Sequence, residues 1–333
     1  MGGHFYGCDK CGTRQFAYHS CNHRSCPQCG KAATAQWVER ELENRVAAPY
    51  FMVTFTLPAE LRTLFFGPQA KEIYDLFFAA TSCVLREKLA ARKWLGAQVS
   101  GFTGILHTWN QRLHFHPHIH YLVQAAGLDG SGRLVTVKSA NFLLPLPVLS
   151  RAFRKHFLQR LEAAGHSFDP ALADKDWGVH IQPFGSGANA IKYLGAYVCR
   201  TAIADSRIVS ISEHEVTFRW KDRENGGRTR TDTIPGVEFV ARYLRHVLPR
   251  GLRAIRRYGF CHPAAKATRQ RVAFHTGRPL LAGPIEQTTA STAPTTPLCP
   301  CCQQPMTLRG SIPAFHLAAR APPPIPSQLP CVA

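Results

Sequence analysis

Two histidines, His118 and His120, stand two residues apart in the segment 104–124, with Ile119 between them. The segment predicts an apolar strand, a histidine-rich turn and a second strand over residues 118–125. Because side chains alternate across a strand, both imidazoles face one way and Ile119 packs the other way. Two neutral imidazoles on a rigid strand are typical of metal ligands, although a short His-x-His motif also fits a solvated or structural pair.

Two tyrosines, Tyr193 and Tyr197, stand four residues apart in a segment that predicts a helix over residues 188–200. Residues i and i+4 share a helix face, so both phenols project together. Aromatic residues at this spacing mostly pack in a core. The spacing alone therefore favours a packing role for this pair.

The first 30 residues contain two Cys-x2-Cys pairs at a spacing that suits tetrahedral zinc. Their members are Cys8, Cys11, Cys26 and Cys29. A module this small buries too little apolar surface to fold alone, so the metal would supply folding energy. Cys21 and His23 lie between the pairs. Either could replace a ligand or help to hold a second ion, and the ligand set stays open among these six residues.

The last part of the chain differs in composition. From about Gly277 the residues Pro, Thr, Ala and Ser dominate, and the apolar residues show no helical or strand periodicity. This composition predicts a disordered tail. Cys299 and Cys302 interrupt it in the sequence Cys-Pro-Cys-Cys. Two thiolates make half a zinc site, and the role of this half stays open.

The charge balance indicates a polyanionic partner. Lys and Arg number 40 against 21 Asp and Glu, which gives a net charge of +19 and a pI near 9.8. Nucleic acid is favoured over a membrane, because no amphipathic basic helix stands out. The apolar stretches are shorter than the roughly 20 residues that span a bilayer, and the N-terminus lacks a secretory pattern. We therefore expect a reducing, cytoplasmic setting in which the cysteines bind metal or stay as buried thiols.

The hydrophobic periods predict a mixture of helices and strands. The expected helices are 31–46, 70–94, 146–164, 188–200 and 237–247. The expected strands are 48–57, 104–109, 118–125, 176–184, 208–211, 216–221 and 228–234. The last two form a basic hairpin around an Asn-Gly-Gly turn.

The motifs occur in one order that resembles a known family. They are Cys-x2-Cys, His-Ser-Cys-Asn-His-Arg-Ser-Cys-Pro-Gln-Cys (19–29), His-Pro-His-Ile-His (116–120), Tyr-Leu-Gly-Ala-Tyr-Val-Cys-Arg-Thr-Ala-Ile-Ala (193–204) and Phe-Arg-Trp-Lys-Asp (218–222). The ordered set resembles the insertion-sequence ninety-one type of rolling-circle transposase, in the His-hydrophobic-His endonuclease superfamily. The resemblance covers roughly residues 3–263 and the cysteines near 300, and it favours a catalytic role for the tyrosines.

The resemblance implies an α+β fold, in which a small zinc-binding module precedes a catalytic domain with an antiparallel sheet and flanking helices. It also implies an enzyme that nicks and rejoins single-stranded DNA at the ends of its element. His118 and His120 would hold Mg²⁺ or Mn²⁺, and Tyr193 or Tyr197 would form a 5′-phosphotyrosine link. Structural Zn²⁺ would fold an N-terminal module that grips DNA. The expected domains are a zinc-binding DNA-contact module (1–46), a transposase catalytic domain (47–263) and a Pro/Thr-rich tail (264–333).

Some positions stay open or depart from the family pattern. A third polar ligand is expected for the catalytic ion, and a hairpin would place His107 beside His120, with Gln111 and His116 as alternatives. Cys199 stands where the pattern has histidine. The chain starts almost on the zinc module, which favours a shortened reading frame or a misplaced start. The order in which the two tyrosines act, the terminal sequence, the target and the oligomeric state are not fixed by the sequence.

Two other functions fit part of the pattern. One is a zinc-dependent DNA-binding protein without catalysis, such as a decayed or truncated transposase. The other is a basic scaffold for RNA. Neither needs both a histidine pair and a tyrosine pair, so the combination favours the transposase.

Overall fold

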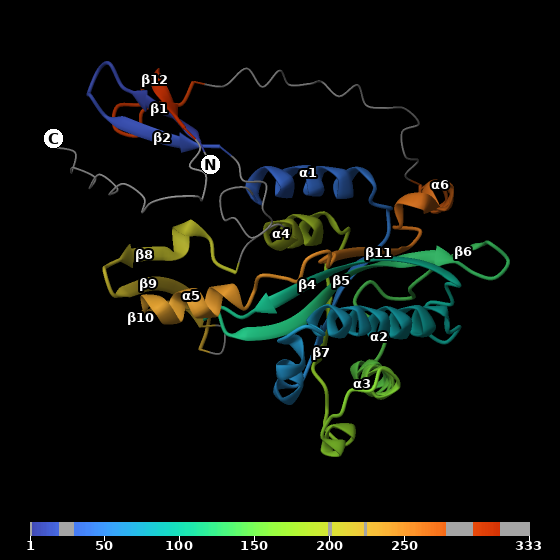
Figure 1. Cartoon of the computed structure of the whole chain (residues 1–333). Helices are drawn as coiled ribbons and strands as arrows, with labels where there is room; N and C mark the ends of the chain where they lie inside the picture. The colour runs from blue at the N-terminus through green and yellow to red at the C-terminus, as the bar shows by residue number, and fades with distance from the viewer. Residues whose placement is uncertain (1, 20–29, 199–201, 223–224, 278–295, 314–333) are drawn as a thin grey trace. The chain divides into compact units, whose positions relative to one another are not determined.

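A long hairpin of two strands, β4 (Val99–Trp109) and β5 (Phe115–Leu128), forms the middle of the main sheet of this computed structural model (Figure 1). The sheet is antiparallel throughout, in the order β11–β4–β5–β3–β7, and the short β6 pairs with β5. The other strands are β3 (Tyr50–Thr56), β6 (Leu134–Thr136), β7 (Val179–Pro183) and β11 (Ile255–Gly259). The antiparallel sheet expected from the sequence is thus confirmed.

The register of the hairpin sets two faces of this sheet. His107 lies opposite His118, and Ile105 lies opposite His120. On the other side of β5, Thr54 of β3 lies opposite His120. Because directly opposed residues point the same way, one face carries these histidines, and we call it the histidine face. The other face, which we call the core face, is apolar.

Two helices, α2 (Ala70–Ala90) and α3 (Leu146–Ala163), pack on the core face (Figure 1). The fully buried rings of Phe55 and Tyr121 lie in this layer, and the Tyr121 hydroxyl lies 2.8 Å from the hydroxyl of Thr81 on α2. Gly104 faces Tyr121 across the hairpin, and a Cβ there would lie 2.5 Å from its ring. The glycine therefore leaves room for the ring.

Helices α1 (Gly30–Glu43) and α4 (Ala188–Val198) cover part of the histidine face (Figure 1). Trp37, Ile191 and Leu194 pack there with sheet residues that alternate with the core residues. Those sheet residues are Tyr50, Met52, Ile105 and Leu122. The helix that carries Tyr193 therefore lies on the same face as the histidines.

A second, smaller sheet has the order β10–β9–β8. Its strands are β8 (Ile208–Ile211), β9 (Glu215–Asp222) and β10 (Arg228–Pro235), and α5 (Gly236–Leu244) follows directly. Fully buried Phe218 packs with Phe239 of α5. After β11, helix α6 (Lys266–His275) buries Val272 and Ala273 against Phe260. The three short strands match those expected from the sequence at 208–211, 216–221 and 228–234.

A separate three-stranded sheet joins both ends of the chain, in the order β12–β1–β2. Its strands are β1 (Gly3–Gly7), β2 (Arg14–Tyr18) and β12 (Thr307–Ile312). The expectation of a structureless tail is wrong for residues 307–312. Their apolar pattern is weak, but β1 supplies the hydrogen-bonding partner that this segment lacks on its own.

The structure describes residues 2–19, 30–198, 202–222, 225–277 and 296–313, with only the backbone for 30–33, 196–198 and 205. It divides into one unit of Met1–Cys29 with Ala282–Ala333 and another of Gly30–Leu281. The expected module 1–46 extends past this division, because α1 packs on α4 in the larger unit. Of the helices in the described ranges, none has the length and apolar character to cross a membrane.

Candidate active site and basic pocket

Three imidazoles meet on the histidine face. One ring nitrogen from each of His107, His118 and His120 lies within 4.8 Å of the others. The ring centroids are 4.8 Å apart for His107 and His120, 4.8 Å for His118 and His120, and 5.4 Å for His107 and His118. His107 is buried, and the other two are half-buried. The hairpin thus brings His107 to the pair, directly opposite His118 and with its ring also close to that of His120.

Two hydrogen bonds orient the rings of β5. Nδ1 of His118 donates to the main-chain carbonyl of His116 at 2.7 Å. A carbonyl can only accept, so the neutral His118 ring keeps its lone pair on Nε2. Nδ1 of His120 lies 2.8 Å from the hydroxyl oxygen of Thr54. Contacts of this kind fix the ring angle and tautomer of histidines that ligate metals.

The group fits a divalent ion by its chemistry. Three neutral imidazoles suit a transition ion such as Mn²⁺ at least as well as Mg²⁺, which prefers oxygen ligands. Within the described ranges the group contains no carboxylate. The remaining coordination positions would be open to water or to phosphate oxygens.

The two alternative third ligands face other partners. Nδ1 of His116 accepts a hydrogen bond from Nη2 of Arg62 at 3.1 Å. Burial, together with the Arg62 charge, lowers the pKa of His116. The side-chain oxygen of Gln111 accepts from the main-chain N–H of Lys221 at 3.4 Å, in the smaller sheet of this unit. His107 is therefore the candidate that the geometry favours.

The helix with the tyrosines begins at a tight contact with the sheet. At Gly187, just before α4, a Cβ would lie 2.5 Å from the ring of Tyr50. Tyr193 is half-buried, with its ring centroid 5.9 Å from that of Phe184. The side chain of Tyr197 and the whole of Cys199 lie outside the described residues. The structure thus places Tyr193 on the histidine face, and the position of the second phenol stays a prediction.

The predicted zinc ligands divide into two groups. Cys8 and Cys11 lie beside Cys299 and Cys302, with their sulfurs within 4.8 Å of one another. Cys26 and Cys29, like Cys21 and His23, lie outside the described residues. From the sequence, Cys299 and Cys302 were recognised as half a zinc site, but their partner could not be predicted. The sequence does not show that two segments almost 300 residues apart lie together in the fold.

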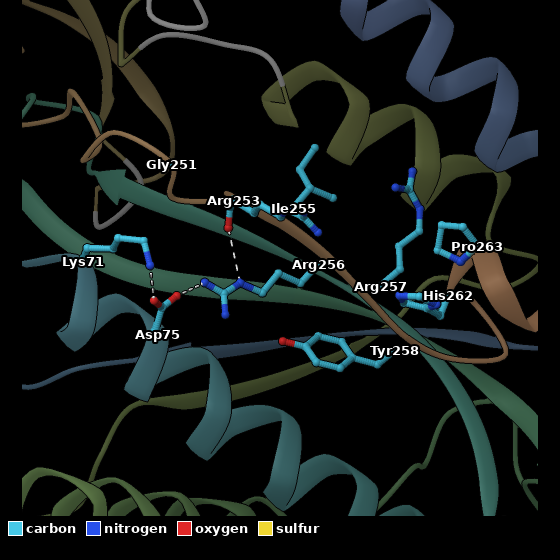
Figure 2. Close-up of a pocket in the computed structure, with 10 residues that line it drawn as sticks. All are labelled: Lys71, Asp75, Gly251, Arg253, Ile255, Arg256, Arg257, Tyr258, His262 and Pro263. Atoms are coloured by element: carbon cyan, nitrogen blue, oxygen red, sulfur yellow. Dashed lines mark hydrogen bonds and ion pairs between the residues drawn. The ribbon is translucent and has the colours of Figure 1, made fainter. Parts of the chain in front are cut away.

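A basic pocket of about 500 Å³ opens along β11 (Figure 2). Its cationic lining is Lys71, Arg253, Arg256 and Arg257. The guanidinium of Arg256 pairs with Asp75 of α2 and lies 4.1 Å from the centroid of the Phe78 ring. Arg257 points to the other face of β11, where its Nε donates to Glu41 of α1 at 2.9 Å. These contacts hold Arg256 and Arg257 in place beside an edge strand.

Residues 101–269 match the family described as a putative transposase, and residues 1–57 match the transposase zinc-binding domain. The chain is 38% identical over 281 residues to the putative transposase y4qJ of Sinorhizobium fredii, a match that spans 78% of this chain and 70% of that protein. It is 28% identical over 270 residues to the transposase for insertion sequence element IS801 of Pseudomonas savastanoi pv. phaseolicola, spanning 76% of this chain and 64% of that protein.

Among solved structures, the chain matches TrwC complexed with a 27-mer DNA comprising the recognition hairpin and the cleavage site. The TM-score is 0.27 and the identity 9%, over 69% of this chain and 75% of TrwC.

Proposed function

The chain belongs to the insertion-sequence transposases, and on that premise we propose that it nicks and rejoins single-stranded DNA through a tyrosine–phosphate intermediate. One observation carries this proposal. Three imidazoles, two of them with rings oriented by hydrogen bonds, share a sheet face with α4, the helix in which Tyr193 and Tyr197 stand. A DNA-binding protein without catalysis has no use for such a group.

His107, His118 and His120 would hold the catalytic ion. Bound Mn²⁺ or Mg²⁺ would polarise a phosphate oxygen and offset charge that develops on phosphorus. The chain itself supplies the rigidity: each histidine stands on a strand inside the sheet, and Thr54 and the carbonyl of His116 restrain two of the rings. Rigid placement of this kind is what positions a phosphodiester for attack.

Tyr193 or Tyr197 would be the nucleophile. The phenol oxygen forms a bond to phosphorus, and the bond from phosphorus to the 3′-oxygen breaks. The product is a 5′-phosphotyrosine and a free 3′-hydroxyl, and the proton lost by the phenol balances the one gained by the 3′-oxygen. The phosphotyrosine conserves the bond energy, so a second 3′-hydroxyl can reverse the step without ATP.

The basic pocket on β11 would bind DNA backbone. Its arginines carry no sequence information, but they would neutralise phosphates and release counterions. A single strand suits the edge of this sheet better than a duplex, because it can bend into a pocket of this size. The zinc-binding domain of the family would add a second contact to DNA.

Adduct formation tests the proposal. The full-length chain is incubated with Mn²⁺ and single-stranded oligonucleotides from the ends of its element, and a denaturing gel then separates protein–DNA adducts. Peptide mass mapping should place the nucleotide on Tyr193 or Tyr197. Substitution of the attacking residue, Tyr193→Phe or Tyr197→Phe, should abolish its adduct while DNA affinity stays near that of the wild type, because only a hydroxyl is lost.

The matched control is Tyr18→Phe, which changes an exposed tyrosine of the other unit. It should leave adduct formation unchanged. Wild-type protein that binds DNA and retains its zinc, yet forms no adduct on any end sequence, would leave only the non-catalytic DNA-binding function.

A further inference from the structure

Four sulfurs from the two ends of the chain lie together in the smaller unit. Sγ of Cys8 is 3.4 Å from Sγ of Cys302, and Sγ of Cys11 is 3.5 Å from Sγ of Cys299. All four lie within 4.8 Å of one another. In tetrahedral zinc with Zn–S bonds near 2.3 Å, neighbouring sulfurs are about 3.8 Å apart. The four sulfurs therefore already stand near the edges of a zinc tetrahedron.

The two cysteine pairs have the same local fold. The main-chain N–H of Cys8 donates to the carbonyl of Thr13, and the N–H of Gly12 donates back to the carbonyl of Cys8. In the second pair, the N–H of Cys299 donates to the carbonyl of Gln304, and the N–H of Gln303 donates back to the carbonyl of Cys299. The spacing of donor and acceptor is identical in both.

The backbone conformation repeats as well. The residue after the second cysteine is left-handed in each pair, with φ +71° at Gly12 and +58° at Gln303. Glycine takes this conformation freely, whereas glutamine is strained in it and needs a surrounding that holds it there. Two segments with unrelated sequences have thus reached one turn geometry, a tight loop that points two sulfurs at one point.

The sheet aligns the two loops. Gly7 of β1, which precedes Cys8, lies opposite Thr307 of β12, five positions after Cys302. Asp9 in the first loop pairs with Arg309, and its other oxygen accepts from the Thr307 hydroxyl at 2.6 Å. Strand pairing and these side-chain contacts bring both loops to the same end of the sheet.

Among the described residues of this unit, the apolar core is small. Its buried members are Cys8, Cys299 and Met306, with Tyr6 and Cys302 packed at the side. So few apolar side chains do not stabilise a three-stranded sheet in water. A metal ion at the four sulfurs would supply the missing folding energy.

We propose that Cys8, Cys11, Cys299 and Cys302 bind one structural Zn²⁺ ion, so that the end of the chain forms half of the zinc-binding module. This ligand set differs from the four N-terminal cysteines expected from spacing, in that the partner of the first pair lies in the C-terminal segment. It also gives the Cys-Pro-Cys-Cys sequence a role. The integrity of the N-terminal sheet then depends on residues almost 300 positions away.

Zinc content of the full-length chain tests this assignment independently of any DNA reaction. Native mass spectrometry and elemental analysis should show one zinc ion fewer per chain in the double variant Cys299→Ser/Cys302→Ser than in the wild type. The matched control is Cys301→Ser, which removes an exposed thiol of the same loop that is outside the sulfur group. It should retain the wild-type zinc content.

A conservative variant separates ligation from misfolding. Cys302→His keeps a zinc ligand at the position, so it should retain the ion, whereas Cys302→Ala should lose it. With Co²⁺ in place of zinc, Cys302→His should show weaker thiolate-to-metal absorption, because one of four thiolates is gone. Wild-type zinc content in Cys299→Ser/Cys302→Ser, or equal zinc loss in Cys301→Ser, would overturn the proposal.

Discussion

The hydroxyl oxygen of Thr54 lies 2.8 Å from Nδ1 of His120, across the pairing of β3 with β5. Thr54→Val removes this contact and keeps the β-branched shape. The ring of His120 then loses its orienting partner, and we expect Mn²⁺ affinity to fall about 10–100-fold. Isothermal titration with Mn²⁺, together with the Mn²⁺ dependence of adduct formation, measures the change.

Thr56→Val is the control for that substitution. Thr56 is on the same strand and lies opposite His118, as Thr54 lies opposite His120, but its hydroxyl has no described hydrogen bond to a histidine. We expect its Mn²⁺ affinity to stay within a few-fold of the wild type. Equal losses in both variants would show that the hydroxyl of Thr54 does not orient a ligand.

The β11 pocket leads to a prediction about salt. Arg253 is exposed at its rim, and Arg253→Gln removes one charge without burying a polar group. We expect weaker binding of single-stranded DNA on all sequences alike, with the slope of log affinity against log salt concentration reduced by about 1. Fluorescence anisotropy at several salt concentrations measures both quantities.

Arg92→Gln is the matched control for the pocket. Arg92 lies just beyond the C-terminal end of α2, whereas Lys71 of the pocket lies in its first turn, roughly 30 Å away at 1.5 Å per residue. The control should keep the wild-type slope. A slope reduced to the same extent in both variants would mean that charge acts over the whole surface and not at the pocket.

Much of the histidine site was predictable, because strand alternation is local. His118 and His120 share a face as their spacing required, and the hairpin brings His107 to them. The start of β5 was predicted too late, because a histidine-rich turn was expected before residue 118, whereas the strand begins at Phe115. The strand includes Pro117 where the register of β4 shifts between His107 and Trp109, so its missing N–H interrupts no regular pair.

The pairing of Cys8 and Cys11 with Cys299 and Cys302 was not predictable in the same way. The Cys-x2-Cys spacing identifies each half of a zinc site, but it does not say which halves meet. The strand that aligns them, β12, follows a long Pro- and Thr-rich stretch, so composition suggested disorder for the whole segment. Only the long-range pairing with β1 shows otherwise.

A buried histidine behind the hairpin makes stability depend on pH. His246 is 7% exposed, with Nε2 donating to the carbonyl of Leu113 and Nδ1 near the Thr108 hydroxyl. Burial lowers its pKa from 6.5 to about 4. Between these two pH values, the unfolded chain binds a proton at His246 that the folded chain does not bind. The contribution of His246 to the free energy of unfolding is therefore unchanged above pH 6.5, and that free energy falls by about 3 kcal/mol as the pH drops to 4.

His246→Gln should flatten this dependence, because an amide can donate to Leu113 and accept from Thr108 without titrating. Urea unfolding of both proteins at several pH values between 4.5 and 7.5 measures the difference. Exposed His275, at the end of α6, serves as the control, and His275→Gln should keep the wild-type slope. If the free energy of unfolding of His246→Gln varied with pH as in the wild type, the loss of stability at low pH would come from other groups.

The contact between Gly187 and Tyr50 gives the last prediction. Gly187 has φ +80°, and an added Cβ would lie 2.5 Å from the fully buried ring of Tyr50. Gly185, in the same loop, has φ +56°, and an added Cβ there meets no described atom within 4 Å. Gly185→Ala should therefore lose only about 1 kcal/mol from backbone strain, whereas Gly187→Ala adds overpacking of about 1–3 kcal/mol. Urea midpoints of the two variants measure the difference, which isolates the contact between Gly187 and Tyr50 at the start of α4.

Because the overpacking would also shift α4, adduct formation should fall more in Gly187→Ala than in Gly185→Ala at a temperature where both are folded. Equal activity and equal stability would show that α4 does not depend on this contact for its position.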